Sequence, residues 1–253
     1  QDTIEGSDYS LRVHYLDEDA DEVKEAVRMC REHKPMGILF LGGNIQYFHE
    51  EFELVNVPCV LVTDRADKLG FRNLASVSTD DMAAAEMAVD YLFDHGHRDI
   101  AVIGGDMALS SPSKYRKAGA KRSFIKHGCE FEEESYAVAR FSYESAYNAM
   151  NRMLASKRSI TAVFAMSDVM AVGAMRAIFD AGLRVPEDIS VIGFDGTLLA
   201  DYYNPKIVTV CQGYEKIARK SIDLLFGMID LNKPATHELV PFSLKNTESV
   251  SSI

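Results

Sequence analysis

The chain has 253 residues, of which 47% are hydrophobic and 26% charged, and its formal net charge is −11 at pH 7. This length fits a globular protein with one large domain or two lobes of ordinary size. The negative net charge argues against direct binding of a nucleic-acid backbone by this chain, because such binding requires clustered Lys and Arg. The apolar runs fall well short of the roughly 20 residues of a membrane-spanning helix.

The cysteine pattern favours a reducing compartment. Cys30, Cys59, Cys129 and Cys211 are far apart in the sequence and form no Cys-x-x-Cys or Cys/His pattern. Two of them lie inside apolar runs, so buried thiols are favoured over a metal site or a disulfide framework. We therefore expect a cytoplasmic protein.

The first half of the chain alternates between helix and strand patterns. Residues 1–6 resemble the start of a helix, and residues 10–15 already have the alternation of a strand. Residues 19–33 predict an amphipathic helix, followed by buried strands over 36–41 and 58–63. A helix over 81–93 then leads to a strand over 100–103. This spacing is typical of parallel sheets covered by helices on both faces.

The second half continues the alternation. Helices are predicted near residues 113–127, 143–155 and 214–229, and strands near 136–140, 207–211 and 237–244. Residues 161–196 are the most regular part, a βαβ unit. Ser167 and Asp168 begin its helix, Gly182 ends that helix, and each strand ends in polar residues. Ligands of open α/β sheets bind at such strand ends.

Two motifs in this unit carry a family resemblance. They are F-A-x-S-D-x-M-A-x-G-A, beginning at Phe164, and G-x-x-V-P-x-D-I-S-V-I-G-F-D, ending at Asp195. Together with G-H-R-x-I-A-x-I-G-G, beginning at Gly96, they resemble the effector-binding core of the LacI/GalR family of bacterial transcription regulators. The resemblance covers nearly the whole chain. It implies an α/β, type I periplasmic-binding-protein-like fold, with two doubly wound parallel-sheet lobes joined by three crossovers.

We map the crossovers near residues 105, 209 and 236. The expected N-terminal lobe comprises residues 1–105 and 209–235, and the C-terminal lobe comprises residues 106–208 and 236–253. In the family a first strand precedes the first helix, so we expect that strand to be missing from this sequence. The helix-turn-helix headpiece is expected to be missing too, and a missing piece between Gly6 and Tyr9 stays open.

Polar residues at strand and helix ends give a candidate ligand site. The carboxylate of Asp195 can accept two hydrogen bonds from adjacent hydroxyls. Arg116 keeps the family's R-x-x-G spacing with Gly119, and its guanidinium offers five fixed donors. The resemblance adds Ser167, where sugar-binding relatives often have Asn, and Gln212. The full candidate set is Asp195, Arg116, Ser167, Asp168, Gln212, Asp64 and Asn44.

Each candidate has a structural alternative that the sequence leaves open. Asp168 is suited to helix capping. Asp195 fits a turn, and Arg116 fits a solvated helix face beside other basic residues. Asp64 and Asn44 are weaker candidates, for which an ordinary loop role is favoured.

The resemblance implies effector sensing. A small molecule, by family default a sugar or sugar derivative, is expected between the lobes of a homodimer that controls operator DNA through the missing headpiece. One alternative is an exported solute-binding protein with the same fold, which four unpaired cysteines fit poorly. The other is a doubly wound enzyme. The sequence contains no dinucleotide fingerprint, phosphate loop or nucleophile motif, so we expect no enzymatic activity, no cofactor and no membrane partner.

Overall fold

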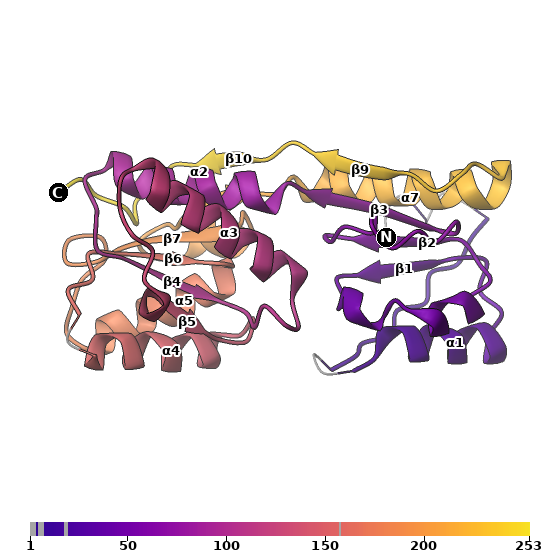
Figure 1. Cartoon of the computed structure of the whole chain (residues 1–253), viewed down its shortest axis with the longest axis horizontal. Helices are drawn as coiled ribbons and strands as arrows, with labels where there is room; N and C mark the ends of the chain where they lie inside the picture. The colour runs from indigo at the N-terminus through magenta and orange to yellow at the C-terminus, as the bar shows by residue number, and fades with distance from the viewer. Residues whose placement is uncertain (1–3, 5–7, 18–19, 157) are drawn as a thin grey trace. The chain divides into compact units, whose positions relative to one another are not determined.

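The computed structural model describes Ile4 and residues 8–17, 20–156 and 158–253. The chain divides into two compact units, Gln1–Thr79 with Tyr214–Val240, and Asp80–Gly213 with Pro241–Ile253. It therefore passes from one unit to the other after Thr79, after Gly213 and after Val240. Each unit contains a largely parallel sheet with helices on both faces (Figure 1). The predicted α/β class with two lobes and three crossovers is confirmed.

The first unit is built around a four-stranded parallel sheet in the order β1-β2-β3-β9. Successive residues of a strand point to opposite faces. Val60 and Val62 of β2 accordingly pack in the core that contains α7, whereas Cys59 and Leu61 belong to the core on the α1 side. The described elements are α1 (Glu22–Glu32), β1 (Ile38–Leu41), the 3₁₀ helices η1 (Ile45–Tyr47) and η2 (Glu50–Leu54), β2 (Cys59–Val62), β3 (Leu74–Thr79), α7 (Tyr214–Leu231) and β9 (His237–Val240).

The second unit contains a six-stranded sheet in the order β10-β8-β7-β6-β4-β5, in which β10 is antiparallel. Helices α2 and α3 cover one face, and α4 and α5 cover the other (Figure 1). Its elements are α2 (Asp81–Asp94), β4 (Ile100–Gly104), α3 (Ser111–Lys126), the 3₁₀ helix η3 (Glu133–Ser135), β5 (Tyr136–Val138), α4 (Tyr143–Ala155), β6 (Ala162–Ala165), α5 (Asp168–Asp180), β7 (Ser190–Asp195), α6 (Leu198–Tyr202), β8 (Val208–Cys211) and β10 (Ser243–Lys245).

The lobe boundary that the sequence suggested near residue 105 lies elsewhere in the structure. Strand β4 pairs in parallel with β5 and β6, and so belongs to the sheet of the second unit. The first crossing is therefore after Thr79. Strands and helices alternate without interruption on both sides of this point, so hydrophobic periodicity carries no signal for it. The other two crossings, expected near 209 and 236, fall a few residues later.

Two strand predictions also need correction. Residues 10–15 form no strand, and Leu11, Val13 and Tyr15 are exposed. An alternating pattern becomes a strand only when a neighbouring strand supplies backbone partners, and no strand in the described part of the chain pairs with this segment. The predicted extended segment 237–244 is two strands, β9 and β10, which belong to different sheets. The helix start predicted at residues 1–6 falls mainly on residues outside the described ranges.

Glycines allow the helix pairs of the second unit to approach closely. A Cβ atom on Gly119 of α3 would lie 2.1 Å from the carbonyl oxygen of Met82 in α2. One on Gly173 of α5 would lie 2.3 Å from the carbonyl oxygen of Tyr143 in α4. Contacts this short exclude any side chain. Because Arg116 is one turn before Gly119, the same contact holds it against α2.

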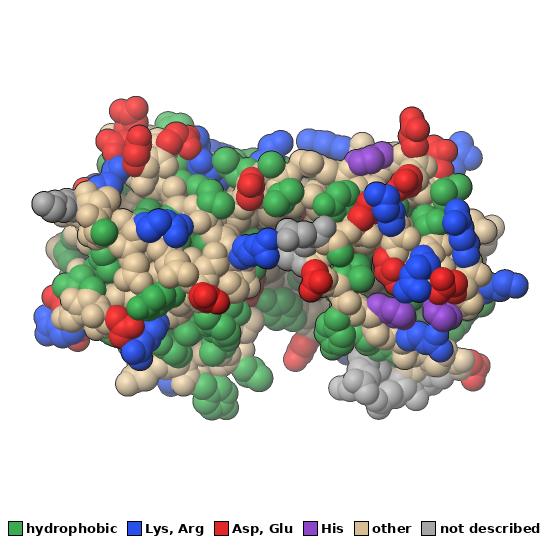
Figure 2. All heavy atoms as spheres, turned by 90° about the horizontal axis from the view of Figure 1, so that it is seen from below, with side chains coloured by type: hydrophobic (Ala, Val, Ile, Leu, Met, Phe, Trp, Pro, Cys, Tyr) green, Lys and Arg blue, Asp and Glu red, His purple; other side chains and the backbone are tan. Residues whose placement is uncertain are grey.

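Charged side chains are interleaved rather than separated by sign. On the face that Figure 2 shows, Lys and Arg side chains lie beside Asp and Glu side chains. On α1, Arg28 pairs with Glu32 at 2.8 Å, and Lys24 pairs with Asp21 at 3.0 Å. The described side chains on this face therefore form no continuous basic stripe of the kind that binds a phosphate backbone.

Candidate functional site

The carboxyl ends of β6, β7 and β8 meet at one edge of the second unit's sheet. β7 pairs in parallel with both neighbours, and its last residue, Asp195, lies opposite Cys211 of β8. Ser167 lies just after the end of β6, and Gln212 directly follows β8. The strands themselves are almost entirely buried. The polar side chains therefore lie at the carboxyl ends of the strands, which is where ligands of open α/β sheets bind.

Arg116 reaches this edge from α3. Its side chain is buried, with 5% of its surface exposed. Nε donates to Oδ1 of Asp81 at 2.7 Å, and Nη1 donates to the carbonyl oxygen of Met166 at 2.6 Å. The guanidinium carbon lies 3.7 Å from the centre of the Phe194 ring. These contacts fix the guanidinium in one orientation, so the alternative of a solvated surface arginine does not hold.

Asp195 lies next to this guanidinium and remains partly exposed. Its Oδ1 atom is 3.9 Å from Nη1 of Arg116 and accepts a hydrogen bond from Nε2 of Gln212 at 2.7 Å. Burial raises the pKa of the Asp195 carboxyl to about 7, and the neighbouring carboxylates of Asp168 and Asp81 add to the effect. Arg116 and the Gln212 hydrogen bond oppose it.

The backbone at this corner is in a conformation that is rare outside glycine. Asp195 has a φ of +115°, and Gly196 follows with a φ of +74°. A Cβ atom on Gly196 would lie 2.6 Å from Sγ of Cys211, so only glycine fits there. Strained backbone of this kind is concentrated at functional sites, which supports a role for Asp195 beyond closing a turn.

Ser167 and Asp168 have structural roles in this arrangement. Oγ of Ser167 accepts from the backbone N–H of Met170 and so caps α5. The fully buried carboxylate of Asp168 accepts from both the N–H and the hydroxyl of Thr197, at 2.7 and 2.8 Å, and from the hydroxyl of Thr209 at 2.5 Å. Burial raises its pKa, and these hydrogen bonds oppose the rise. Ligand contact by either residue stays a prediction.

The remaining two candidates belong to the first unit. Asn44 caps η1 by accepting from the backbone N–H of Gln46, and its own N–H donates to Glu22. Asp64 is buried, and its Oδ1 accepts from the N–H of Arg65 at 2.7 Å. Both follow strands of the first unit's sheet. Their role in ligand binding stays a prediction.

Sequence reasoning missed two residues that shape the site. The sequence indicates only a helix start at Asp81, yet the carboxylate of this residue holds Arg116. In the sequence, Phe194 is only part of the motif that ends at Asp195, yet its ring supports the guanidinium. The sequence does contain a signal that Asp81 has a role other than capping. Two acidic residues are adjacent at the helix start, and Asp80 alone caps the helix by accepting from the N–H of Ala83.

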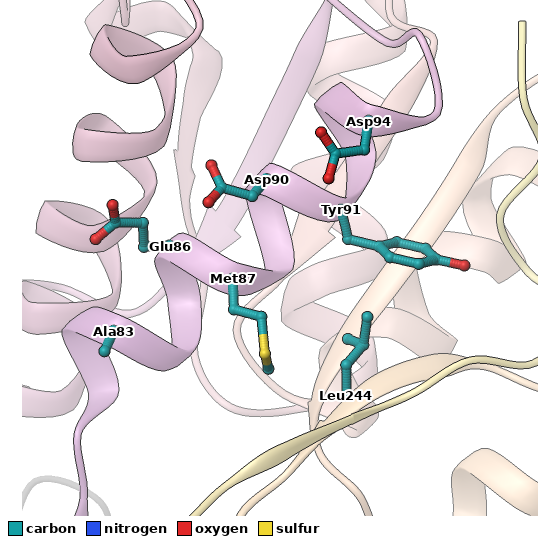
Figure 3. A pocket seen from close by; sticks show the side chains of 7 residues that line it. All are labelled: Ala83, Glu86, Met87, Asp90, Tyr91, Asp94 and Leu244. Atoms are coloured by element: carbon teal, nitrogen blue, oxygen red, sulfur yellow. The ribbon is translucent and has the colours of Figure 1, made fainter.

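A hollow of about 470 Å³ on the second unit lies apart from these residues. In Figure 3, Met87 and Tyr91 of α2 point toward Leu244, and Glu86 and Asp90 point to the other side of the helix. The two acidic residues are matched by bases of α3, Glu86 by Arg122 at 3.2 Å and Asp90 by Lys126 at 2.6 Å. Because the charges of Glu86 and Asp90 are both neutralised, these two side chains give the hollow no net charge that would attract a ligand.

The described residues offer neither a metal site nor a membrane span. Within the described ranges, no group of three or more His, Cys, Asp or Glu side chains is placed to hold a metal ion. None of the helices described in the structure is both long and apolar enough to cross a membrane.

Comparison with known proteins agrees with this architecture. A model of the periplasmic binding protein-like domain matches residues 89–250. The chain is 34% identical over 236 residues to the HTH-type transcriptional regulator MalR of Clostridium butyricum, covering 92% of this chain and 70% of that protein. It is also 34% identical over 196 residues to the HTH-type transcriptional repressor CytR of Escherichia coli (strain K12), covering 76% and 56% respectively.

Solved structures show the same relationship. A complex of the transcriptional regulator CelR with cellobiose superposes with a TM-score of 0.81 at 26% identity, covering 90% of this chain and 70% of that one. A dimeric Lac repressor superposes with a TM-score of 0.80 at 26% identity, covering 91% and 83%. The fold is thus that of the periplasmic-binding-protein-like proteins. The chain belongs to the LacI family of transcription regulators and matches their effector-binding domain.

Proposed function

We propose that this chain senses a small-molecule effector, a sugar or sugar derivative, which binds at the Arg116–Asp195 edge. The observation that carries the proposal is a fixed guanidinium beside a partly exposed carboxylate at the ends of parallel strands. Such a pair offers donors and acceptors at once, as a polyhydroxy ligand requires. The similarity to a regulator in complex with cellobiose supports a carbohydrate.

The response to the effector follows from the two-unit architecture. We assign Ser167, Asp168, Gln212, Arg116 and Asp195 of the second unit to the effector site, and Asn44 and Asp64 of the first unit remain candidate ligand-binding residues. A ligand favours the arrangement of the chain in which it binds better, and shifts the equilibrium only by that difference in affinity. Operator affinity then changes through a helix-turn-helix segment outside this sequence, in a cytoplasmic regulator. The interleaved charges of Figure 2 are consistent with DNA binding by a separate segment.

The functional unit in this proposal is a homodimer. Large hydrophobic side chains are exposed on the second unit, among them Leu198 at 74% and Tyr202 at 86%. A hollow of about 400 Å³ is lined largely by Tyr143, Tyr147, Val172 and Tyr203. Exposed apolar surface of this kind marks protein interfaces. Tyr202→Asp is expected to weaken self-association in sedimentation equilibrium, and an unchanged mass would place the interface elsewhere.

A thermal-shift screen tests the proposed function. The panel comprises monosaccharides, disaccharides, sugar phosphates, nucleosides and purines. A ligand at 100 times its dissociation constant stabilises the domain by about 2.7 kcal/mol, which raises the melting temperature visibly. Stabilisation by a sugar supports the proposal. Stabilisation by a purine alone, or silence across the panel, would overturn the carbohydrate assignment.

Two alternatives predict other outcomes. An exported solute-binding protein would also bind sugar, but its full reading frame would carry a signal peptide where a regulator carries a helix-turn-helix. The similarity to curated transcription regulators favours the latter. An enzyme would convert the stabilising ligand, which incubation and product analysis would detect.

A further inference from the structure

The charge of Arg116 is already matched inside the protein. Nε donates to Oδ1 of Asp81 at 2.7 Å, and the two side chains expose only 5% and 4% of their surface. Solvent screens such a buried pair little, so the two charges cancel effectively. Two of the five N–H donors of Arg116 are used by Asp81 and the Met166 carbonyl, and the others can still donate to neutral oxygens.

The surroundings of the guanidinium are negative rather than positive. Asp195 lies 3.9 Å from it. The carboxylates of Asp168 and Asp81 both raise the pKa of Asp195. One guanidinium thus lies next to two carboxylates, Asp81 and Asp195, and a third, Asp168, acts on Asp195. A further anion next to Asp195 would meet net repulsion.

Nearby lysines do not reverse this balance. Lys117 and Lys121 of α3 both bind Glu133, each at 2.6 Å. Lys245 of β10 is paired with Asp201. Each of these ammonium groups is therefore bound to a carboxylate other than Asp195, Asp168 and Asp81, with Glu133 shared by two of them.

Helix capping does not account for Asp81. The N-cap of α2 is Asp80, whose side chain accepts from the N–H of Ala83. Asp81 is the next residue, and it directs its carboxylate to α3. Substitution of Asp81 therefore leaves the capping bond of α2 in place.

We propose that Asp81 sets the charge selectivity of this site, so that the domain binds uncharged polyhydroxy ligands and rejects their phosphorylated or carboxylated analogues. The inference rests on the proposed function, because it assumes that the effector contacts Arg116 and Asp195. Asp81 acts through Arg116 and is a positioning residue that also neutralises charge.

The test uses matched ligand sets that differ only in charge. Suitable sets are glucose, glucose 6-phosphate and glucuronate; galactose, galactose 6-phosphate and galacturonate; and ribose with ribose 5-phosphate. Affinities are measured by titration calorimetry for the wild-type chain and for Asp81→Asn, which keeps an oxygen acceptor for Nε of Arg116 but removes the charge. We expect the wild type to bind the neutral member at least tenfold more tightly, and Asp81→Asn to reduce that ratio at least tenfold.

Asp94→Asn is the matched control. It makes the same change in net charge on the same helix, 13 residues further along, or about 20 Å at 1.5 Å per residue. Its selectivity ratio should equal that of the wild type. A second variant, Asp81→Glu, keeps the charge and should retain the preference for neutral ligands, which separates charge from shape.

The outcomes distinguish this inference from the proposed function. Tighter binding of an anionic member by the wild type, or an unchanged ratio in a folded Asp81→Asn, would overturn the role of Asp81 while leaving a sugar sensor in place. If Asp81→Asn does not fold, the wild-type ratio and Asp81→Glu decide the question. Binding of no member of any set would overturn the proposed function and the inference with it.

Discussion

Nη1 of Arg116 lies 3.9 Å from Oδ1 of Asp195. This separation is longer than a hydrogen bond, so the two groups attract each other without direct bonding. Each therefore keeps hydrogen-bonding capacity for a third molecule next to them. Gln212 holds the carboxylate, and Asp81 and Met166 hold the guanidinium. The pair is thus oriented in advance, which lowers the entropic cost of binding.

Asp195→Asn is expected to remove most ligand-induced stabilisation. The amide keeps the size of the side chain but loses the charged acceptor, and a hydrogen bond to a charged group contributes about 1.5–3 kcal/mol. Affinity for the stabilising sugar should fall roughly 10- to 100-fold by calorimetry. Asp188→Asn, on a surface ion pair with Arg184, serves as the control and should bind normally. Equal affinities in all three proteins would exclude Asp195 from the site.

Arg116→Ala is expected to destabilise the fold as well as abolish binding. From the sequence alone, an alanine here should spare the fold, but the structure shows a buried ion pair with Asp81. Removing one partner of a buried pair costs about 3–5 kcal/mol, because it leaves the other charge uncompensated. Urea denaturation measures the loss. Arg176→Ala, which breaks an exposed pair with Asp180, should leave the free energy of unfolding nearly unchanged. Similar losses in both variants would contradict the buried pair.

Gly119→Ala tests the contact that positions Arg116. The new Cβ atom would lie 2.1 Å from the carbonyl oxygen of Met82, and backbone cannot yield as a side chain can. Overpacking of this kind costs about 1–3 kcal/mol or more. Gly227→Ala in α7 is the control, because its Cβ would meet only the Lys233 side chain, at 3.3 Å. A melting temperature that is lowered equally, or not at all, in both variants would show that α2 and α3 do not require Gly119.

The stability of the domain should depend on pH through Asp195. Its pKa is raised to about 7, so the folded chain binds this proton more tightly than the unfolded chain does. The resulting stabilisation is complete below the unfolded value of about 4 and is lost as the pH rises to about 7, with a slope of at most about 1.4 kcal/mol per pH unit. Arg116, Asp168 and Asp81 are the charged groups that act on this carboxyl.

Comparison with Asp195→Asn isolates this contribution. Burial lowers the pKa of His97, which gives an opposite slope in both proteins and cancels in the difference. Between pH 5 and 7.5 the free energy of unfolding of the variant should therefore rise relative to that of the wild type. Parallel pH profiles would refute the raised pKa. Sugar affinity in the wild type should increase over the same range, because ligand hydroxyls donate to the ionised carboxylate.

Much of the fold could be predicted because the sequence features that specify its helices, strands and turns are local. The βαβ unit around Ser167 and Asp195 has clear periodicity, capping residues and turns, and its elements are confirmed. The boundary after Thr79 could not be predicted, because the chain changes sheets without changing its pattern. The alternation in residues 10–15 failed as a strand prediction, since pairing depends on a neighbour and not on the segment alone.

The site was predictable in part for the same reason. Asp195 ends β7 and Gln212 directly follows β8, so their shared edge follows from the parallel order. The partner of Arg116 did not follow, because Asp81 is 35 residues away and meets it only through the packing of two helices. The sequence also left open whether Asp168 contacts a ligand. Its bonds to Thr197 and Thr209, which depend on the tertiary fold, give its carboxylate an internal role.

The most direct test of the central claim is amide and arginine side-chain chemical-shift mapping with the tightest-binding sugar of the screen. The account predicts the largest chemical-shift changes at Gly196, at Gln212 and at the Nε–H of Arg116. All three titration curves should fit the same dissociation constant. Changes concentrated instead at Met87, Tyr91 and Leu244 around the hollow of Figure 3, with the three site signals unmoved, would contradict it.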